Sequence, residues 1–345
     1  MLKVNREKHS LIIYAVLLLG FLIGCGNVAS ETNAPPMQMP EMVAVPGGTF
    51  EMGYGAAGTA SGPVHDVTLS AYEIGKYEIT NDEYASMLNY ALVKGYLAGE
   101  YTNNVTVMNR YGDSQELIDL DGYYEGKRSQ IFFSDGIFVV EQGMGNRPVR
   151  YVTWFGAAFY TNMLNEEAGL TIYYDLTDWQ LNLTGGLGYR IQTEAEWERA
   201  ARYADGRAVP WRAYDPGESE MDMWIALEAQ IASGTYANFN GNVGDSTDVD
   251  SYATGVSVLG IYNMIGNVSE WCQDYYSAYK NEAQTDPVND SSGVYRQRRG
   301  GGWLYYANNF YWATYHTDTN YGFVSYCDLG FRVVKSSAAL NAIVF

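Results

Sequence analysis

The chain has 345 residues, 47% of them hydrophobic and 15% aromatic, which is enough to bury the core of one large domain or two small ones. Its formal net charge of −19 repels phosphate backbones, so nucleic acid is excluded as an expected partner. His65 and His316 are scattered and have no CxxC or HExxH partner, which excludes a transition-metal centre.

The chain begins with a targeting segment. A basic start is followed by an apolar run over 11–23, short for a membrane span, and the run ends in LIGC at 22–25. This pattern matches a bacterial lipobox and predicts a signal peptide over 1–24 with lipid on Cys25; an uncleaved anchor helix is the alternative. We therefore expect a location on the bacterial outer membrane or cell surface, with membrane contact through the lipid anchor.

Residues 25–41 are polar and contain prolines, which predicts the lipidated cysteine and a flexible tether. The folded part is expected from Met42, and no break in composition divides 42–345, so we predict a single domain there. Lipidation of Cys25 leaves Cys272 and Cys327. In an oxidising envelope these two could pair or stay free, and their number and spacing do not decide between the two.

Three helices are predicted, each opened by a threonine cap. Thr80 with Glu83, and Thr193 with Glu196, have the spacing of capping boxes. The expected helices run from about 81 to 93, from Thr153 to a stop at Gly169, and from Thr193 to Tyr203. The remaining chain is rich in Gly, Asn, Asp and Tyr, so we expect a loop-dominated α+β domain.

Six sequence blocks, in order, carry a resemblance. They are VPGGTFEMG at 45–53, YEITN at 77–81, YRIQTEAEWE at 189–198, YNMIGNVSEW at 262–271, RGGGW at 299–303 and GFRV at 330–333. Together they resemble the formylglycine-generating-enzyme, or sulfatase-modifying-factor, family over about 42–335. The resemblance implies a C-type-lectin-like fold of the formylglycine-generating-enzyme type, α+β and low in regular secondary structure.

Within these blocks several residues have structural interpretations. Trp197 and Trp271 lie in apolar or helical patterns and are expected in the core. Glu194 and Glu196 are interpreted as helix-start carboxylates rather than as an acid–base pair. The glycines at 300–302 lack the Lys-Ser/Thr of a phosphate loop, so they predict close backbone packing.

The resemblance also addresses catalysis. Catalytic members oxidise a substrate cysteine with copper, using two cysteines that follow a Gly-Gly-Ser-aromatic stretch. In this chain the two cysteine positions are Tyr305 and Phe310, and the serine position is Gly302. Neither side chain can bind Cu(I) as soft sulfur does, and Cys327 lies too far along to substitute, so we expect no oxidase chemistry.

A structural calcium ion is a further expectation from the resemblance. The family's metal-binding segment matches a loop here that can supply oxygen ligands, at Asn263, Gly266, Val268 and Glu270. A second family site matches less well, with drifted spacing, at Asn238, Phe239, Asn242 and Gly244. A loop held by ordinary hydrogen bonds is the alternative for both.

The segment 303–328 has an unusual composition. It holds six tyrosines and three asparagines but no Lys, Glu, Gln or Met. Adenine-directed change of AAC codons leaves such a set, and here the chain resembles the spirochaete variable lipoproteins of diversity-generating retroelements. The positions expected to vary, and to bind ligand, are Tyr305, Tyr306, Asn308, Asn309, Tyr311, Tyr315, His316, Asp318, Asn320 and Tyr321.

This composition suits recognition, because tyrosine offers a large amphipathic contact area at low entropic cost. The alternative is that the segment only continues a chain with 31 tyrosines. Three functions remain open: a diversified surface binder of an unknown protein or glycan ligand, a fixed structural or motility-complex lipoprotein, and an oxidase-like enzyme. A near-copy of the 3′ coding end that differs at adenines would indicate the first.

Overall fold

The computed structural model describes residues 34–55, 61–99, 101, 105–182, 186–213, 215, 217–290, 293–305 and 318–336. Cys25 and the expected signal peptide lie outside these residues. The Met37 side chain is buried in the core, and the Gln38 backbone N–H donates to Ser86 Oγ at 3.0 Å, so the fold begins before Met42. Within the described ranges, no helix has the length and apolar character needed to cross a bilayer.

The three predicted helices are confirmed as α1 (Asn81–Lys94), α2 (Trp154–Ala168) and α3 (Glu194–Arg202). Thr80 and Thr193 form complete capping boxes, and the Thr153 hydroxyl accepts the N–H of Gly156. Gly169 ends α2 in the left-handed region at φ 65°, which favours glycine. A fourth helix, α4 (Glu220–Ala232), was not predicted.

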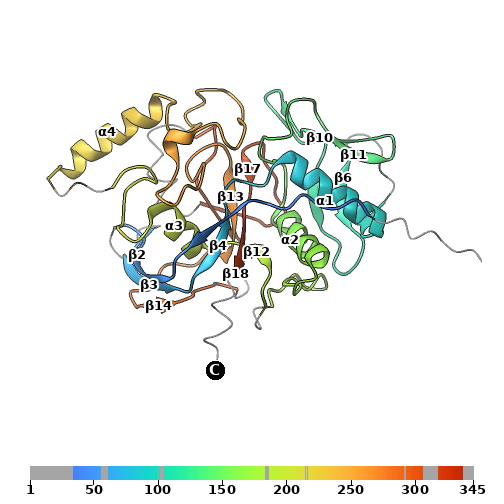
Figure 1. Ribbon diagram of the computed structural model, residues 1–345, viewed down its shortest axis with the longest axis horizontal. Helices are drawn as coiled ribbons and strands as arrows, with labels where there is room; N and C mark the ends of the chain where they lie inside the picture. The colour runs from blue at the N-terminus through green and yellow to red at the C-terminus, as the bar shows by residue number, and fades with distance from the viewer. Residues whose placement is uncertain are drawn as a thin grey trace, which may run out of the picture. The chain divides into compact units, whose positions relative to one another are not determined.

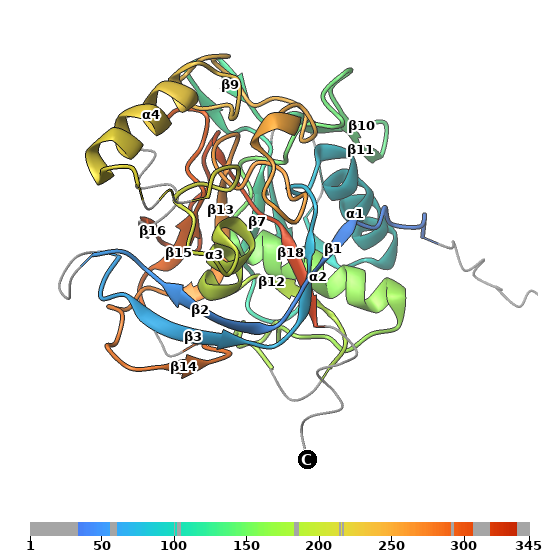
Figure 2. The same ribbon diagram turned by 60° about the vertical axis from the view of Figure 1, so that its left-hand side comes forward.

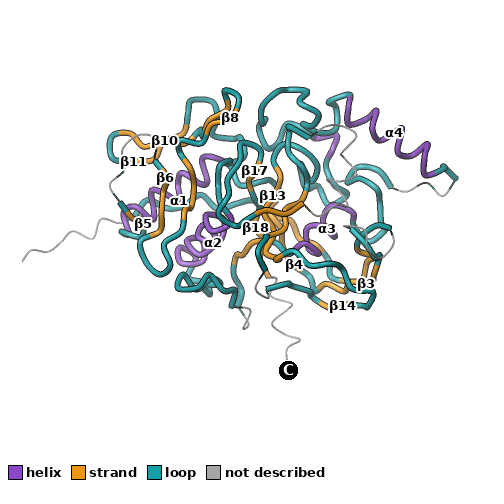
Figure 3. Tube along the Cα trace, turned by 180° about the vertical axis from the view of Figure 1, so that it is seen from behind, coloured by secondary structure: helices purple, strands orange, loops and turns teal. Residues whose placement is uncertain are grey.

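The central sheet is antiparallel, with strand order β1-β4-β18-β12. Its strands are β1 (Met42–Val45), β4 (Tyr72–Gly75), β18 (Val333–Ser336) and β12 (Tyr189–Ile191). The sheet therefore joins the two ends of the described chain. In Figures 1 and 3, α1 and α2 lie to one side of these strands and α3 to the other.

A second sheet, of order β16-β15-β13-β17, carries the chain into and out of segment 303–328. Its strands are β13 (Ser269–Tyr275), β15 (Arg296–Arg299), β16 (Asp318–Asn320) and β17 (Leu329–Gly330), with β13 and β17 parallel. A third sheet packs near α3, as Figure 2 shows, and contains β2 (Gly48–Met52), β3 (His65–Leu69) and β14 (Gln284–Thr285).

The region 97–140, which connects α1 to α2 in the chain, forms small antiparallel sheets. They are β5 (Leu97–Ala98), β6 (Thr106–Asn109) and β7 (Glu116–Asp119); β8 (Tyr123–Tyr124) and β9 (Lys127–Arg128); and β10 (Ile131–Ser134) and β11 (Ile137–Val140). A 3-10 turn, η1, spans Ala253–Gly255. Loops predominate in Figure 3, with 19% helix and 26% strand, which confirms the α+β prediction.

The core is rich in aromatic side chains. Trp154, Trp197 and Trp271 have no exposed surface, which confirms the prediction for the last two. Trp154 Nε1 donates to the Cys272 carbonyl at 3.0 Å, and Trp271 Nε1 donates to the Val152 carbonyl at 3.1 Å. Each indole N–H thus has a partner, and the two bonds tie α2 to β13.

Candidate functional site

The two ends of segment 303–328 meet at a rigid base. Trp303 is 4% exposed, and its Nε1 donates to the Cys327 carbonyl at 3.3 Å. Its backbone N–H donates to the Asn267 carbonyl at 2.9 Å. Gly302 is required here, because a Cβ would lie 2.7 Å from Cβ of Asp328. The burial expected for Trp303, Phe331 and the glycines at 300–302 is observed.

Most of the expected varied positions lie outside the described residues, namely Tyr306, Asn308, Asn309, Tyr311, Tyr315 and His316. Asp318 and Asn320 belong to β16, the edge strand of the second sheet, and Tyr321 follows it. Tyr321 is 39% exposed and Asn320 is partly exposed, in keeping with a solvent-facing role.

Tyr305 differs from the expectation of a mostly solvent-facing side chain. It is half-buried, its ring centroid lies 6.2 Å from that of Phe239, and Arg298 Nη2 donates to its hydroxyl at 2.9 Å. The reason is its place one turn from the Trp303 anchor, where its backbone N–H donates to the Gly302 carbonyl at 3.0 Å. Tyr305 therefore belongs partly to the base of the segment.

An exposed aromatic patch lies beside Tyr321. We define it as Tyr295, Tyr321 and Phe323, which are 39%, 39% and 58% exposed. The ring centroid of Tyr321 lies 4.7 Å from that of Tyr295 and 5.0 Å from that of Phe323. Sequence reasoning named only Tyr321, because Tyr295 precedes the segment and reaches the patch through the pairing of β15 with β16.

A cavity of about 370 Å³ opens under the C-terminal part of the segment. One wall comes from the segment, with Leu304, Ser325, Tyr326 and Cys327, and the other from Tyr123, Tyr124 and Tyr151. Tyr123 is 71% exposed and Tyr124 48%. The tyrosines outside the segment, which form what we call the fixed wall, thus face residues within it.

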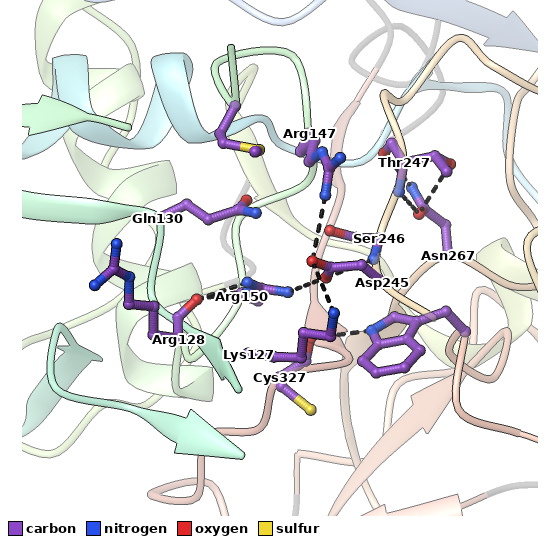
Figure 4. Close-up of polar contacts among 12 residues, drawn as sticks. Lys127, Arg128, Gln130, Arg147, Arg150, Asp245, Ser246, Thr247, Asn267 and Cys327 are labelled. Atoms are coloured by element: carbon purple, nitrogen blue, oxygen red, sulfur yellow. Dashed lines mark hydrogen bonds and ion pairs between the residues drawn. The ribbon is translucent and has the colours of Figure 1, made fainter. Parts of the chain in front are cut away.

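The fixed wall is held by ion pairs around Asp245, shown in Figure 4. The Arg150 Nη1 lies 2.5 Å from Asp245 Oδ1, with Arg147 and Lys127 at 3.4 and 3.6 Å from Oδ2. Arg150 is 3% exposed and also donates to the Arg128 carbonyl at 2.7 Å. One carboxylate therefore fastens hairpin β8–β9 to the loop before η1, which keeps that wall rigid.

Among the residues expected to hold calcium, one side-chain oxygen has no partner and one carboxylate is already hydrogen-bonded. Asn263 is buried and its Oδ1 has no partner, as a waiting ligand would. Glu270 does not fit, because Arg332 Nη2 and Nε donate to its two oxygens at 2.5 and 2.8 Å, and Trp197 Nε1 donates at 3.1 Å. Both oxygens of this carboxylate therefore already have hydrogen-bond donors. Gly266 and Val268 could offer only carbonyls, and calcium at this loop stays a prediction.

The thiols in the described residues are poorly suited to copper chemistry. Cys272 and Cys327 are both free and buried. Burial raises the pKa of Cys272 well above its usual range and the pKa of Cys327 to about 12. Because the thiolate is the form that binds metal, neither cysteine is prepared for that role at neutral pH.

The fold and site together define a loop-rich α+β scaffold with a cavity lined in part by the two described ends of segment 303–328. Residues 28–337 match the model of the sulfatase-modifying factor enzyme 1-like domain, and the chain belongs to that family. It is 32% identical over 281 residues to the serine/threonine-protein kinase Pkn1 of Chlamydia trachomatis serovar L2, which covers 80% of this chain and 35% of that relative. The chain thus spans about a third of that kinase's length.

Two further similarities confirm the predicted fold. The formylglycine-generating enzyme of Thermomonospora curvata is 28% identical over 292 residues, covering 76% of this chain and 82% of the enzyme. Among solved structures, Treponema denticola variable protein 1 matches with a TM-score of 0.60 and 22% identity, covering 86% of this chain and 95% of that one. The C-type-lectin-like fold of the formylglycine-generating-enzyme type follows from these matches.

Proposed function

We propose that the chain is a surface-displayed, non-catalytic ligand-binding lipoprotein, anchored through Cys25, whose segment 303–328 is diversified by a retroelement. The observation that carries this proposal is the aromatic patch, which lies at the edge of the segment and is exposed although its rings are large and apolar. Exposed tyrosines are typical of binding surfaces, because a tyrosine side chain loses little conformational entropy when it binds. The patch and the tyrosine-walled cavity both adjoin residues whose composition matches adenine-directed change.

Two further features support a binding role. The base formed by Trp303 and Cys327 is closed by hydrogen bonds to backbone, so side chains above it can change without altering the scaffold. The fold is similar to that of a protein named Treponema denticola variable protein 1, which supports the proposal. The neighbouring DNA tests the proposal: a copy of the 3′ end differing at adenines, beside a reverse transcriptase, is the expected finding.

Tolerance to substitution tests the same proposal on the protein. Tyr321→Asp is expected to lower the free energy of unfolding by about 1 kcal/mol or less, because the ring is exposed and loses only its ring contacts and an exposed hydroxyl hydrogen bond with Tyr295. Trp303→Ala should cost about 3–5 kcal/mol as a buried anchor. Urea unfolding measures both. If Tyr321→Asp costs as much as Trp303→Ala, the segment is structural and the fixed lipoprotein is the better account.

The non-catalytic part of the proposal has its own test. The purified domain, supplied with copper and a cysteine-containing sulfatase peptide, is expected to give no conversion above buffer. The reason is that Tyr305 and Phe310 occupy the two cysteine positions and neither remaining thiol is ionised at neutral pH. The Thermomonospora curvata enzyme serves as the positive control. Copper-dependent conversion would restore the oxidase-like alternative.

A further inference from the structure

A second cavity, of about 530 Å³, lies away from segment 303–328. It is lined by β3, by the first turn of α3 and by the chain from 274 to 289. Figure 2 shows β3, β14 and α3 gathered in this part of the fold. None of the residues discussed for the aromatic patch takes part in it, so this cavity is a separate feature of the molecule.

Two buried carboxylates face this cavity, and only one of them has a hydrogen-bond partner on each of its oxygens. Asp274 accepts the backbone N–H of Glu194 at 2.7 Å and that of Asn289 at 2.8 Å, one on each oxygen. Glu194 Oε1 accepts the hydroxyl of Tyr279 at 2.7 Å. Its Oε2 has no hydrogen-bond partner among the residues the structure describes. Glu194 is 6% exposed, so this oxygen is an acceptor held at the cavity wall.

His65, in strand β3, supplies a second acceptor at the cavity wall. It is 8% exposed and lines the same cavity. Its Nδ1 lies 3.0 Å from the Pro63 carbonyl, which can only accept, so Nδ1 carries the hydrogen. In the neutral ring Nε2 is then an acceptor, and it has no partner in the described part of the chain. The ring is fixed by an edge contact with Tyr279, at 5.2 Å between centroids.

Among the described side chains, Glu194 has no guanidinium of its own. Arg299 Nε is 3.8 Å from Glu194 Oε1, but the same guanidinium donates to Glu198. Arg202 also binds Glu198, at 2.5 Å. Both guanidiniums thus bind Glu198, so Glu194 has only the more distant contact with Arg299, while Arg296 lies near Asp274. An ion pair on the cavity wall, Lys280 with Glu282 at 3.9 Å, is mostly exposed and adds no net charge.

The remaining wall of the cavity is mixed. Its apolar part is formed by Met52, Ala195, Ala278, Pro287 and Val288, and its polar part by Ser277, Lys280, Glu282, Gln284 and Thr285. A ligand that fits this lining carries a positively charged group with hydrogen-bond donors, attached to a short hydrocarbon chain. Among the described residues no three His, Cys, Asp or Glu side chains are placed to hold a metal ion, so a compact divalent cation fits less well.

We propose that this cavity binds a small aliphatic amine in its ammonium form, with Glu194 Oε2 and His65 Nε2 accepting its hydrogens and the apolar part of the wall covering its carbon chain. An ammonium group has three donors and no acceptor, which matches the two acceptors that Glu194 Oε2 and His65 Nε2 offer at the cavity wall. Asp274 contributes charge without direct contact, because both its oxygens are bound to backbone N–H groups. The proposal does not depend on the function of segment 303–328.

Calorimetry at pH 8 with putrescine tests it, with 1,4-butanediol as the neutral ligand of the same length. Putrescine is expected to bind and butanediol not to bind. Glu194→Gln should weaken putrescine at least tenfold, since an amide cannot replace the charge, while it keeps an oxygen for the Tyr279 hydroxyl. His65→Phe, which keeps the ring but removes Nε2, should weaken it several-fold. Glu51→Gln, an exposed change, is the matched control.

Equal binding of butanediol would overturn the proposal, as would unchanged affinity in Glu194→Gln. Binding of calcium chloride that competes with putrescine and disappears in Glu194→Gln would show a metal site instead. Melting curves at pH 8 establish that each variant is folded. If Glu194→Gln were unfolded, His65→Phe would still decide the question, because its ring preserves the contact with Tyr279.

Discussion

Replacing Arg332 with methionine is expected to lower the free energy of unfolding by about 3–5 kcal/mol, because it leaves a buried carboxylate without its counter-charge. Arg332 and Glu270 have no exposed surface, and two guanidinium nitrogens donate to the two carboxylate oxygens at 2.5 and 2.8 Å. The same guanidinium donates to the carbonyls of Gly75 at 3.0 Å and Tyr262 at 2.9 Å. One side chain therefore joins β18, β4 and the loop before β13.

Urea unfolding of Arg332→Met against Arg128→Met, which alters an exposed arginine, measures this effect. The double variant Glu270→Gln with Arg332→Met should recover part of the loss, since it removes the unpaired charge. A loss below about 1 kcal/mol in Arg332→Met would mean that the carboxylate has another counter-ion.

Chelation then tests calcium at the same loop. If Glu270 is held by protein donors without calcium, adding a chelator leaves the melting temperature of the wild type unchanged while Glu270→Ala lowers it. If calcium binds the folded loop, the chelator lowers the wild-type melting temperature, because a ligand bound only to the folded state stabilises it. In that case the effect should be smaller in Glu270→Ala if this carboxylate is a ligand.

Local chemistry explains which helices could be predicted. Thr80 and Thr193 are followed three residues later by glutamate, so both ends of each capping box are visible in the sequence. The fourth helix was missed although Ser219 caps it by accepting the N–H of Asp222, because the stretch before it is rich in Gly, Asp and Pro and resembles a loop. The short strands over 97–140 depend on pairing rather than on a local pattern.

The site was predictable only in part, for a related reason. Composition identified the segment 303–328, and its buried anchor Trp303 followed from the family block. Tyr295 became part of the aromatic patch only through strand pairing, and Asp245 became the centre of an ion-pair cluster only through packing of separate loops. Glu270 was assigned to metal by resemblance, yet its partner Arg332 lies 62 residues away in sequence. Contacts of this kind have no local signature.

Stability is expected to rise as the pH falls from 8 to about 5, by several kcal/mol in total. Burial raises the pKa of Glu78 and of Glu194 to about 7, and that of Asp274 to about 6. The folded state therefore holds these protons more tightly than the unfolded chain, whose carboxyls titrate near their ordinary values. The stabilisation is complete below the unfolded pKa and is lost as the pH rises through the folded pKa. For a carboxyl whose pKa is raised to about 7, the total loss is about 3 kcal/mol.

Glu194→Gln isolates one of these groups. The variant should be more stable than the wild type at pH 8 by up to about 3 kcal/mol and within about 1 kcal/mol of it at pH 5, while exposed Glu51→Gln follows the wild type throughout. Urea unfolding at each pH measures the difference, and parallel curves for Glu194→Gln and wild type would contradict it. A carboxylate that destabilises the fold at neutral pH is expected to persist where it binds something, and Glu194 faces the cavity proposed for an amine.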